Sequence, residues 1–219
     1  MVYISFISIA VISYLLGSLN FGVILSKKME KDDVRNHGSG NAGSTNMMRS
    51  YGKKAGILTI LGDMLKVFVA IFIAIKIYEH TPMLLVTNPF SNIVLFVKAY
   101  AGFFCVLGHI FPCFFKFKGG KGVATSGGMV FAIDWRIALI LLAVFIVVVL
   151  VTKYVSLGSI IMAVLYPVMM YLFYHAADLT IIAAVFTVIV LLTHMPNIAK
   201  LVTHTENRID FSKMKKSSK

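Results

Sequence analysis

Long runs of apolar, uncharged residues are the feature that most constrains this chain. The run from about residue 2 to 25 carries no charged side chain, and it exceeds the roughly 20 residues that a helix needs to cross a bilayer. Hydrophobic residues make up 58% of the sequence, and the mean hydropathy is +0.86, both above the usual values for soluble domains. In hydrocarbon every backbone polar group must be paired within the chain, so such runs predict spanning helices. We therefore expect an all-α integral membrane protein.

Six more apolar segments follow the first one. They are expected at about 55–78, 92–114, 123–133, 137–152, 154–174 and 179–193. The segment 123–133 is too short to cross a hydrocarbon core of about 30 Å at helical rise. Crossing by this segment would give seven spans, and re-entry together with its partner would give five. We favour seven spans, in one domain that covers residues 1–219.

Basic residues are confined to short segments between the apolar runs. The net charge is +12, which is common among nucleic-acid-binding proteins. However, the loops of membrane proteins collect lysine and arginine on the cytoplasmic side. The densest basic loop joins the first two spans, so it is expected in the cytoplasm, with the N-terminus outside and the C-terminus cytoplasmic. Membrane lipids are therefore expected partners, and nucleic acid is not.

The loop between the first two spans contains the run GSGNAGSTNMMR, from Gly38 to Arg49. It has no apolar stripe at helix or strand spacing, so it is not expected in the core. Glycines let backbone N–H groups approach a ligand closely, and the forked guanidinium of Arg49 suits planar oxyanions. The run predicts a cradle for an anion, above all phosphate, at a membrane face. Its candidate ligand-binding residues are Ser39, Gly40, Asn41, Gly43, Ser44, Thr45 and Asn46.

Two other interpretations of this run are weaker. Gly38, Gly40 and Gly43 form a G-x-G-x-x-G pattern, but a dinucleotide-binding fold needs a preceding strand within a soluble βαβ unit. Here a lysine-rich loop precedes the pattern. A flexible loop of small residues is the other alternative, and the hydroxyl and amide side chains that accompany Arg49 argue against it. Clustered amides can still form a nest for anions outside a dinucleotide-binding fold.

A second cluster of glycine and lysine follows the third span, with GHIFP at 108–112 and KFKGGKG at 116–122. A P-loop would need a glycine where Phe115 stands and a serine or threonine where Gly122 stands. Nucleotide binding by that device is therefore excluded. The flanking glycines still allow the lysine between them to meet a phosphate. The candidates in this cluster are Gly119, Gly120 and Lys121, whereas Lys116 and Lys118 are expected to be ordinary cytoplasmic-side charges. His109 is open between packing and function.

The third polar cluster is HMPNI at 194–198, where the last apolar segment ends. Pro196 lacks a backbone donor and clashes with the preceding turn, so it weakens helix continuity. We therefore expect the last span to end near residue 193, with His194 and Asn197 turned toward the loops. Because all three polar clusters are predicted on one membrane face, these two residues are candidates for the same site.

Asp63 and Lys66 are charged residues inside the second span. Such residues normally pair or line a polar cavity, and at this spacing they share a helix face. Pairing with each other and binding of substrate are both open. Cys105 and Cys113 lie in one apolar segment, which indicates packing rather than a disulfide. No metal site is expected, because no histidine–cysteine spacing suggests one.

The ordered motifs GSGNAGSTNMMR, GHIFP with KFKGGKGVAT, and HMPNI with a downstream glutamate resemble the PlsY family of bacterial glycerol-3-phosphate acyltransferases. The likeness covers nearly the whole chain, including GD-x-x-K in the second span and YVSLGS at 154–159. It implies seven helices in the bacterial cytoplasmic membrane and a site facing the cytoplasm. It also implies transfer of a fatty acyl group from acyl phosphate to the 1-hydroxyl of glycerol 3-phosphate, giving lysophosphatidate and phosphate. No cofactor is expected, and neither CoA nor acyl carrier protein is expected as the direct donor.

The resemblance also implies residue roles. The residues that match catalytic positions of the three motifs are Ser39, Arg49, Lys121, His194 and Asn197. Ser159 is similar to a serine that the family brings to the site. One departure is visible, since His204 stands where the third motif usually has glycine, two residues before Glu206. Neither the local turn nor a role for Glu206 therefore follows from the resemblance.

The chemistry implied by the resemblance is mainly positioning and charge stabilisation, because acyl phosphate is already an activated anhydride. Arg49 and Lys121 are cations that could hold two phosphorylated substrates. Soluble-type acyltransferases of this pathway use a histidine and an aspartate separated by four residues, and no histidine here has that partner. Proton removal by His194 and by the acyl phosphate's own oxygen are both open. The alternative functions are a transporter or channel for a phosphorylated anion, whose usual internal repeat is lacking, and a scaffold protein.

Overall fold

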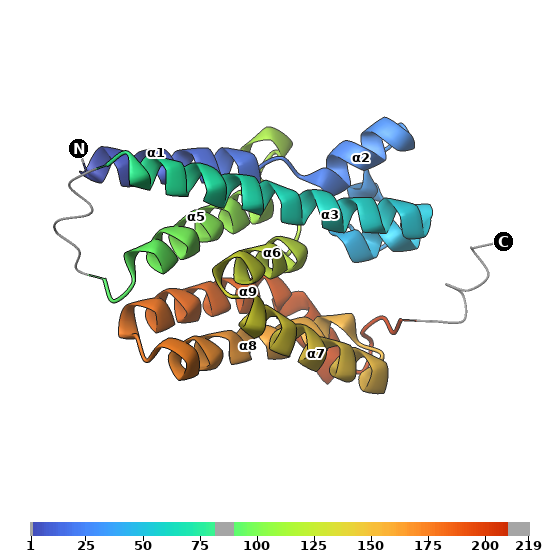
Figure 1. The fold of residues 1–219 in the computed structure, drawn as a ribbon. Helices are drawn as coiled ribbons and strands as arrows, with labels where there is room; N and C mark the ends of the chain where they lie inside the picture. The colour runs from blue at the N-terminus through green and yellow to red at the C-terminus, as the bar shows by residue number, and fades with distance from the viewer. Residues whose placement is uncertain (1, 82–89, 210–219) are drawn as a thin grey trace. The chain divides into compact units, whose positions relative to one another are not determined.

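The computed structural model describes residues 2–81 and 90–209, and the secondary structure in these ranges is helical throughout (Figure 1). Six helices are long and apolar enough to cross a membrane, at Tyr3–Met29, Ser44–Glu79, Ile93–Phe115, Trp135–Thr152, Val155–Tyr174 and Ala177–Val202, and a shorter apolar helix covers Val123–Ile133. The predicted all-α membrane fold, with its seven apolar segments, is confirmed. The loop expected between the second and third spans and the basic end of the tail lie largely outside the described residues.

The chain divides into two compact units, Met1–Ile133 and Asp134–Lys219. The first unit contains α1 (Val2–Gly17), α2 (Phe21–Met29), η1 (Val34–Asn36), α3 (Ser44–Glu79), α5 (Ile93–Ile110), η2 (Cys113–Phe115) and α6 (Val123–Ile133). In this unit α1 packs on α5, and α3 contacts α1, α2, α5 and α6 (Figure 1). α3 is therefore the helix around which the first unit is assembled.

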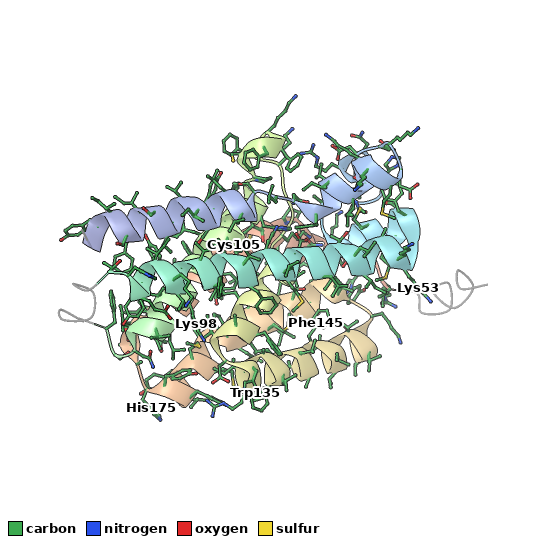
Figure 2. All side chains as sticks on the ribbon, turned by 45° about the horizontal axis from the view of Figure 1, so that its top comes forward. Lys53, Lys98, Cys105, Trp135, Phe145 and His175 are labelled. Carbon is green, nitrogen blue, oxygen red and sulfur yellow. The ribbon has the colours of Figure 1, made fainter. Side chains whose placement is uncertain are left out.

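Glycines let α1 and α5 pack at short distance. A Cβ atom at Gly17 would lie 2.0 Å from the carbonyl oxygen of Cys105, and a Cβ atom at Gly108 would lie 2.1 Å from the carbonyl oxygen of Tyr14. Small residues at helix interfaces in membranes allow this close approach of backbones. Cys105, labelled in Figure 2, is buried at this interface, which agrees with the predicted packing role.

The first span is broken where α1 ends and α2 begins. Ser18, Leu19 and Asn20 lie between the two helices, and the side-chain oxygen of Asn20 accepts a hydrogen bond from the N–H of Val23 at 3.2 Å, which caps α2. The break leaves carbonyl groups at the end of α1 without helical donors. In a membrane such groups need a partner from elsewhere in the chain.

Lys66 of α3 supplies that partner. Its ammonium donates to the carbonyl oxygens of Gly17 at 3.0 Å and Leu19 at 3.2 Å. It also lies 2.9 Å from Oδ1 of Asp63, as an ion pair whose side chains are 2% and 1% exposed. The Nδ1 atom of His109 on α5 is 2.8 Å from the same ammonium. Of the two roles left open for Asp63 and Lys66, mutual pairing is therefore observed, and it joins three helices.

α3 begins inside the first glycine-rich motif, which the sequence placed in a loop and outside the core. Gly43 is the N-cap, and Ser44–Arg49 form the first turns. The prediction is wrong for this half of the motif, because Met47 is fully buried in a cluster with Val23 and Val34. The helix then kinks at Gly52, where φ is 86°, and continues as the second span.

The second unit consists of α7 (Trp135–Thr152), α8 (Val155–Tyr174) and α9 (Ala177–Val202). α8 packs against both α7 and α9. Apolar side chains of α7, whose first residue is the labelled Trp135 (Figure 2), are exposed, among them Val147, Leu150 and Val151. Exposed apolar side chains along a whole helix face are typical of contact with lipid.

α9 does not end near residue 193. It continues through Pro196 to Val202, so the predicted end of the last span is wrong. Proline removes one backbone donor, and membrane helices tolerate this loss when nearby groups satisfy the freed carbonyls. His194 consequently projects from inside a helix, where its side chain is 1% exposed, rather than from a loop.

Replacing Lys66 by Met should lower the thermal stability of the purified protein strongly. The change leaves the buried Asp63 carboxylate without its cation and removes the donor to two carbonyl groups, and breaking a buried pair costs about 3–5 kcal/mol. Thermal unfolding in detergent measures the effect. Lys76→Met is the matched control, because it breaks an exposed pair with Glu79 at the same spacing, worth at most about 1 kcal/mol. Equal unfolding temperatures for the two variants would show that the contacts of Lys66 with Asp63, Gly17 and Leu19 do not stabilise the fold.

Candidate phosphate-binding site

The amide side chain of Asn46 organises the first motif. It is 2% exposed, and its Oδ1 accepts a hydrogen bond from the N–H of Ser39 at 3.0 Å. Its Nδ2 lies 2.9 Å from the carbonyl oxygen of His37, 3.0 Å from that of Asn41 and 3.1 Å from that of Val34. Asn46 was predicted as a phosphate ligand, but its side chain is used to fold the loop back onto α3.

Other amides of this loop are also engaged within it. The N–H of Gly40 donates to the carbonyl oxygen of His37 at 2.9 Å, and the N–H of Gly43 donates to Oδ1 of Asn41 at 2.9 Å. The expected open nest of amides is therefore not what these positions form, because each N–H already has an internal acceptor. Binding of an anion here falls to side chains, and those of Ser39, Thr45 and Arg49 are exposed.

The second motif is pressed against the end of α5. The N–H of Gly119 donates to the carbonyl oxygen of Ile110 at 3.1 Å, and the N–H of Gly120 donates to that of His109 at 3.2 Å. A Cβ atom at Gly119 would lie 1.9 Å from the His109 carbonyl oxygen, and a Cβ atom at Gly120 would lie 2.2 Å from Nε2 of the His109 ring. These two glycines are required by close packing, and Lys121 follows them, half-buried.

His109 links this loop to the buried charges of α3. Its ring is 3% exposed, with Nδ1 at 2.8 Å from the Lys66 ammonium and 3.3 Å from Oδ1 of Asp63. An ammonium can only donate, so Nδ1 is the acceptor and the proton of the neutral ring resides on Nε2. The contacts of Nδ1 with Lys66 and Asp63 thus fix the orientation of the ring, whose Nε2 side lies against Gly120. Of the two roles left open for His109, packing is therefore observed: its ring lies against Gly120, the residue before Lys121.

The first and second motifs meet at one surface cavity of about 350 Å³. Gly40 comes from the first motif and Gly119 from the second, and Arg35, Lys116 and Lys118 line the same cavity. Sequence reasoning missed Arg35 as part of this region, because it counted the residue only as a loop charge. The signal was the Asp33-x-Arg35 spacing, which allows one side chain to pair with the other.

The third cluster lies in the second unit, at the end of α9. His194 has Nδ1 at 2.8 Å from the carbonyl oxygen of Val190, so this nitrogen is the donor. The Nδ2 of Asn197 donates to Oε1 of Glu206 at 2.8 Å, and the hydroxyl of Ser156 on α8 donates to the same oxygen at 2.7 Å. Glu206 therefore ties the ends of two helices together. Ser159, three residues further along α8, donates to the carbonyl oxygen of Val155 at 3.0 Å.

His204, which stands where the motif usually has glycine, lies in a tight turn after α9. His204 has φ of 55°, which is the left-handed conformation that glycine adopts most readily. The N–H groups of Thr205 and Glu206 both donate to the carbonyl oxygen of Lys200, at 2.8 and 3.2 Å. His204 therefore adopts the backbone conformation that a glycine at this position would favour.

Among the residues that the structure describes, no group of three histidine, cysteine, aspartate or glutamate side chains is placed to hold a metal ion. The candidate residues carry cationic, amide and hydroxyl groups instead. Such groups bind and orient oxyanions without a metal.

Comparison with known proteins gives one consistent match. The family model for glycerol-3-phosphate acyltransferase matches residues 7–204. A glycerol-3-phosphate acyltransferase of Clostridioides difficile is 42% identical over 206 residues, covering 94% of this chain and 96% of the relative. One from Bacillus subtilis is 38% identical over 199 residues, covering 91% and 95%.

Two crystal structures of PlsY, an integral membrane glycerol 3-phosphate acyltransferase, are similar to this chain. The glycerol 3-phosphate form has a TM-score of 0.82 at 35% identity and covers 95% of this chain and 98% of its own. The lysophosphatidic acid form has a TM-score of 0.78 at 34% identity, with coverage of 94% and 96%. Fold and sequence thus agree on the same family.

A double-mutant cycle tests the contact between His109 and the second motif. Gly120→Ala should destabilise the protein by about 1–3 kcal/mol, as overpacking typically does. In a His109→Ala background the same change should cost little, because the ring that met the new methyl group is gone. Gly119→Ala is the control: its methyl group meets a backbone carbonyl, so its cost should be equal in both backgrounds. Thermal unfolding measures all five variants, and additivity for Gly120→Ala would contradict the contact.

Proposed function

The chain belongs to the glycerol-3-phosphate acyltransferase family of integral membrane enzymes, and from this membership we propose that its acyl donor is acyl phosphate. In this reaction the 1-hydroxyl oxygen of glycerol 3-phosphate attacks the acyl carbonyl carbon, and the bond from that carbon to the phosphate oxygen breaks. The products are lysophosphatidate and phosphate. This would be the first acylation step of phospholipid synthesis. Membership of an enzyme family sets the transporter, channel and scaffold alternatives aside.

The observation that carries the proposal is the environment of His194. Its Nδ1 donates to the neutral carbonyl of Val190, and the sequence has no histidine with aspartate at the spacing used by soluble-type acyltransferases. A carboxylate partner strengthens a histidine base by stabilising the imidazolium that forms. A donor with phosphate as its leaving group needs less help from a base than a thioester does. The chemistry offered by the chain therefore matches an activated mixed anhydride.

Two phosphorylated substrates must approach one carbonyl group, so their mutual repulsion has to be offset. We assign this role to Arg49 and Lys121, the cations that follow the two glycine-rich runs. Arg49 projects from the first turns of α3 and is exposed. Its planar fork can hold a phosphate through two parallel hydrogen bonds, whereas Lys121 acts as a point charge. Most of the rate enhancement would then come from positioning and electrostatic stabilisation.

Hydroxyl and amide groups complete the proposed site. Ser39 is exposed in the loop that Asn46 holds, so its hydroxyl can donate to the oxyanion that develops on the carbonyl oxygen. With the proton of its neutral ring on Nδ1, His194 presents Nε2 as an acceptor for the attacking 1-hydroxyl. Asn197, held by Glu206, would orient a phosphate oxygen. Thr45 and Ser159 are proposed as further polar contacts.

We place this site at the cytoplasmic face of the bacterial cell membrane, with the N-terminus outside. Support comes from the distribution of charge, because the basic loops at 27–54, 116–121 and 153 and the basic tail all fall on one side when the apolar segments cross in alternation. Glycerol 3-phosphate would then enter from water, and the acyl chain would enter sideways from the bilayer.

The donor is tested with the purified protein in detergent. We expect phosphate release that requires both palmitoyl phosphate and glycerol 3-phosphate, and no product when palmitoyl-CoA replaces palmitoyl phosphate. Arg49→Lys should lower kcat/KM by about 10²-fold, because it keeps the charge but loses the fork. Lys76→Gln, an exposed change at the far end of α3, is the control and should leave the rate unchanged. If palmitoyl-CoA with glycerol 3-phosphate gave product and palmitoyl phosphate with glycerol 3-phosphate did not, the proposed donor would be ruled out.

The pH profile of His194→Gln tests the route of the proton. If Nε2 accepts the hydroxyl proton, kcat/KM of the wild-type enzyme falls on the acidic side of neutrality, because a protonated imidazole cannot accept. The variant should be slower and should lack this limb. A limb that persists in the variant would show instead that an oxygen of the acyl phosphate takes the proton.

A further inference from the structure

The surface cavity of the first unit contains none of the residues to which we assign the chemistry. It is lined by Arg35, Lys116 and Lys118, together with Asp33 and one glycine from each motif. Ser39, Arg49 and Lys121 do not line it. The cavity therefore requires its own explanation, which starts from the way its walls are held.

Arg35 is a structural connector in this cavity. Its guanidinium makes a two-pronged contact with Asp33, with Nε at 2.9 Å from Oδ1 and Nη2 at 2.7 Å from Oδ2. The third nitrogen, Nη1, donates to the carbonyl oxygens of Phe115 and Lys118, both at 2.9 Å. The Arg35 guanidinium lowers the pKa of the Asp33 carboxyl, so the pair stays ionised at neutral pH. One arginine thus joins η1 to a loop about 80 residues further along the chain.

The loop that Arg35 holds has an unusual backbone. Lys116 and Phe117 are consecutive residues with φ of 58° and 56°. These values lie in the left-handed backbone region, which residues other than glycine rarely adopt. The N–H of Phe117 donates to the carbonyl oxygen of Pro112 at 2.9 Å, which helps to keep the loop in place. Strained backbone that the surroundings hold so firmly often marks a functional position. Here its effect is to present Lys116 and Lys118 at the cavity.

The charges of the cavity do not cancel. The negative charge of Asp33 is balanced by Arg35. The ammonium of Lys27 also lies near the same carboxylate, 3.7 Å from its Oδ2. Lys116 and Lys118 then add two positive charges, and both side chains are exposed. Two ammonium groups match the charge of a phosphate monoester, which carries close to two negative charges at neutral pH. A phosphodiester carries only one.

We propose that this cavity is a second anion site, which binds the phosphate of a glycerol phosphate monoester apart from the residues that carry the reaction. Two ligands share this head group: glycerol 3-phosphate in water and lysophosphatidate in the membrane. Exposed aromatic side chains at Phe111, Phe114 and Phe117 flank the lysines, and aromatic residues beside lysines suit a membrane surface. The choice of ligand rests on the proposed function, whereas the site itself rests on the cavity and its charges.

Binding stoichiometry tests the proposal without using turnover. The full-length protein in detergent is equilibrated with radiolabelled glycerol 3-phosphate, and bound equivalents are counted for each variant. We expect two equivalents for the wild type and one for Lys116→Gln/Lys118→Gln. Arg49→Lys/Lys121→Gln should retain the equivalent that the first variant loses. Lys28→Gln/Lys31→Gln, which removes two exposed charges of the same basic stretch outside the cavity, should retain both.

Arg35→Lys separates a built site from general attraction. This change keeps the charge but cannot bridge Asp33 and two carbonyl groups at once, so we expect the second equivalent to bind more than about tenfold more weakly. Unchanged binding in this variant would show that the connector has no role in the site, and the proposal would fail.

Lysophosphatidate micelles distinguish the two sources of the head group. If they displace the second equivalent of glycerol 3-phosphate, or bind as a second equivalent that Lys116→Gln/Lys118→Gln removes, the site takes the lipid-borne head group. Binding of glycerol 3-phosphate alone assigns it to the soluble ester. The proposal is overturned if neither ligand shows an equivalent that depends on Lys116 and Lys118, or if the Lys28→Gln/Lys31→Gln control loses the same equivalent. A wild-type protein that binds twice but releases no phosphate would refute the proposed reaction and leave this site standing.

Discussion

A helix that breaks inside a membrane leaves carbonyl groups without donors, and the first unit meets this constraint at the single ammonium of Lys66. The break between α1 and α2 is stable because Lys66 donates to Gly17 and Leu19, while Asp63 balances its charge. The same ammonium fixes the ring of His109, against which the second motif packs. The shape of the loop that carries Lys121 therefore depends on how the backbone carbonyl groups of the broken first span are hydrogen-bonded. The candidate site of the first unit is thus positioned by contacts in the membrane-embedded part of that unit.

The glycine-rich motifs serve packing more than direct contact with a ligand. The amides of Ser39, Gly40, Gly119 and Gly120 donate to acceptors inside the protein. Such a loop cannot wrap an anion with these amides, as a P-loop does. In the proposed site, the loop instead holds its backbone in place, and long cationic side chains would reach the ligand from it. That arrangement would suit the proposed reaction, in which two phosphates bind and then leave on separate products, because the side chains can follow the moving charge.

The sequence predicted the membrane fold well because apolar runs of spanning length have few alternatives. It failed where tertiary contacts decide: Ser44–Arg49 are helical because Met47 is buried, and α9 passes Pro196 because a membrane helix tolerates the lost donor. The motifs predicted which regions of the chain form the candidate site, but they did not predict the contacts of Arg35. Its contacts with Phe115 and Lys118 span about 80 residues, and no local pattern encodes such a pairing.

The basic loops of this chain would serve two purposes at once. Orientation in the membrane favours lysine and arginine in the cytoplasmic loops, and the reaction proposed above, with its two phosphorylated substrates, would need cations at the same face. The sequence has 21 basic and 9 acidic residues, so acidic partners are too few for every cation. The structure sorts some of them by pairing: Asp63 engages Lys66, and Asp33 engages Arg35. Those pairs are structural. The positive-inside rule alone would explain Lys116 and Lys118 as charges that orient the chain in the membrane. They instead line a cavity whose one carboxylate, Asp33, is already paired with Arg35. An anion in the cavity would neutralise the positive charge of the two lysines.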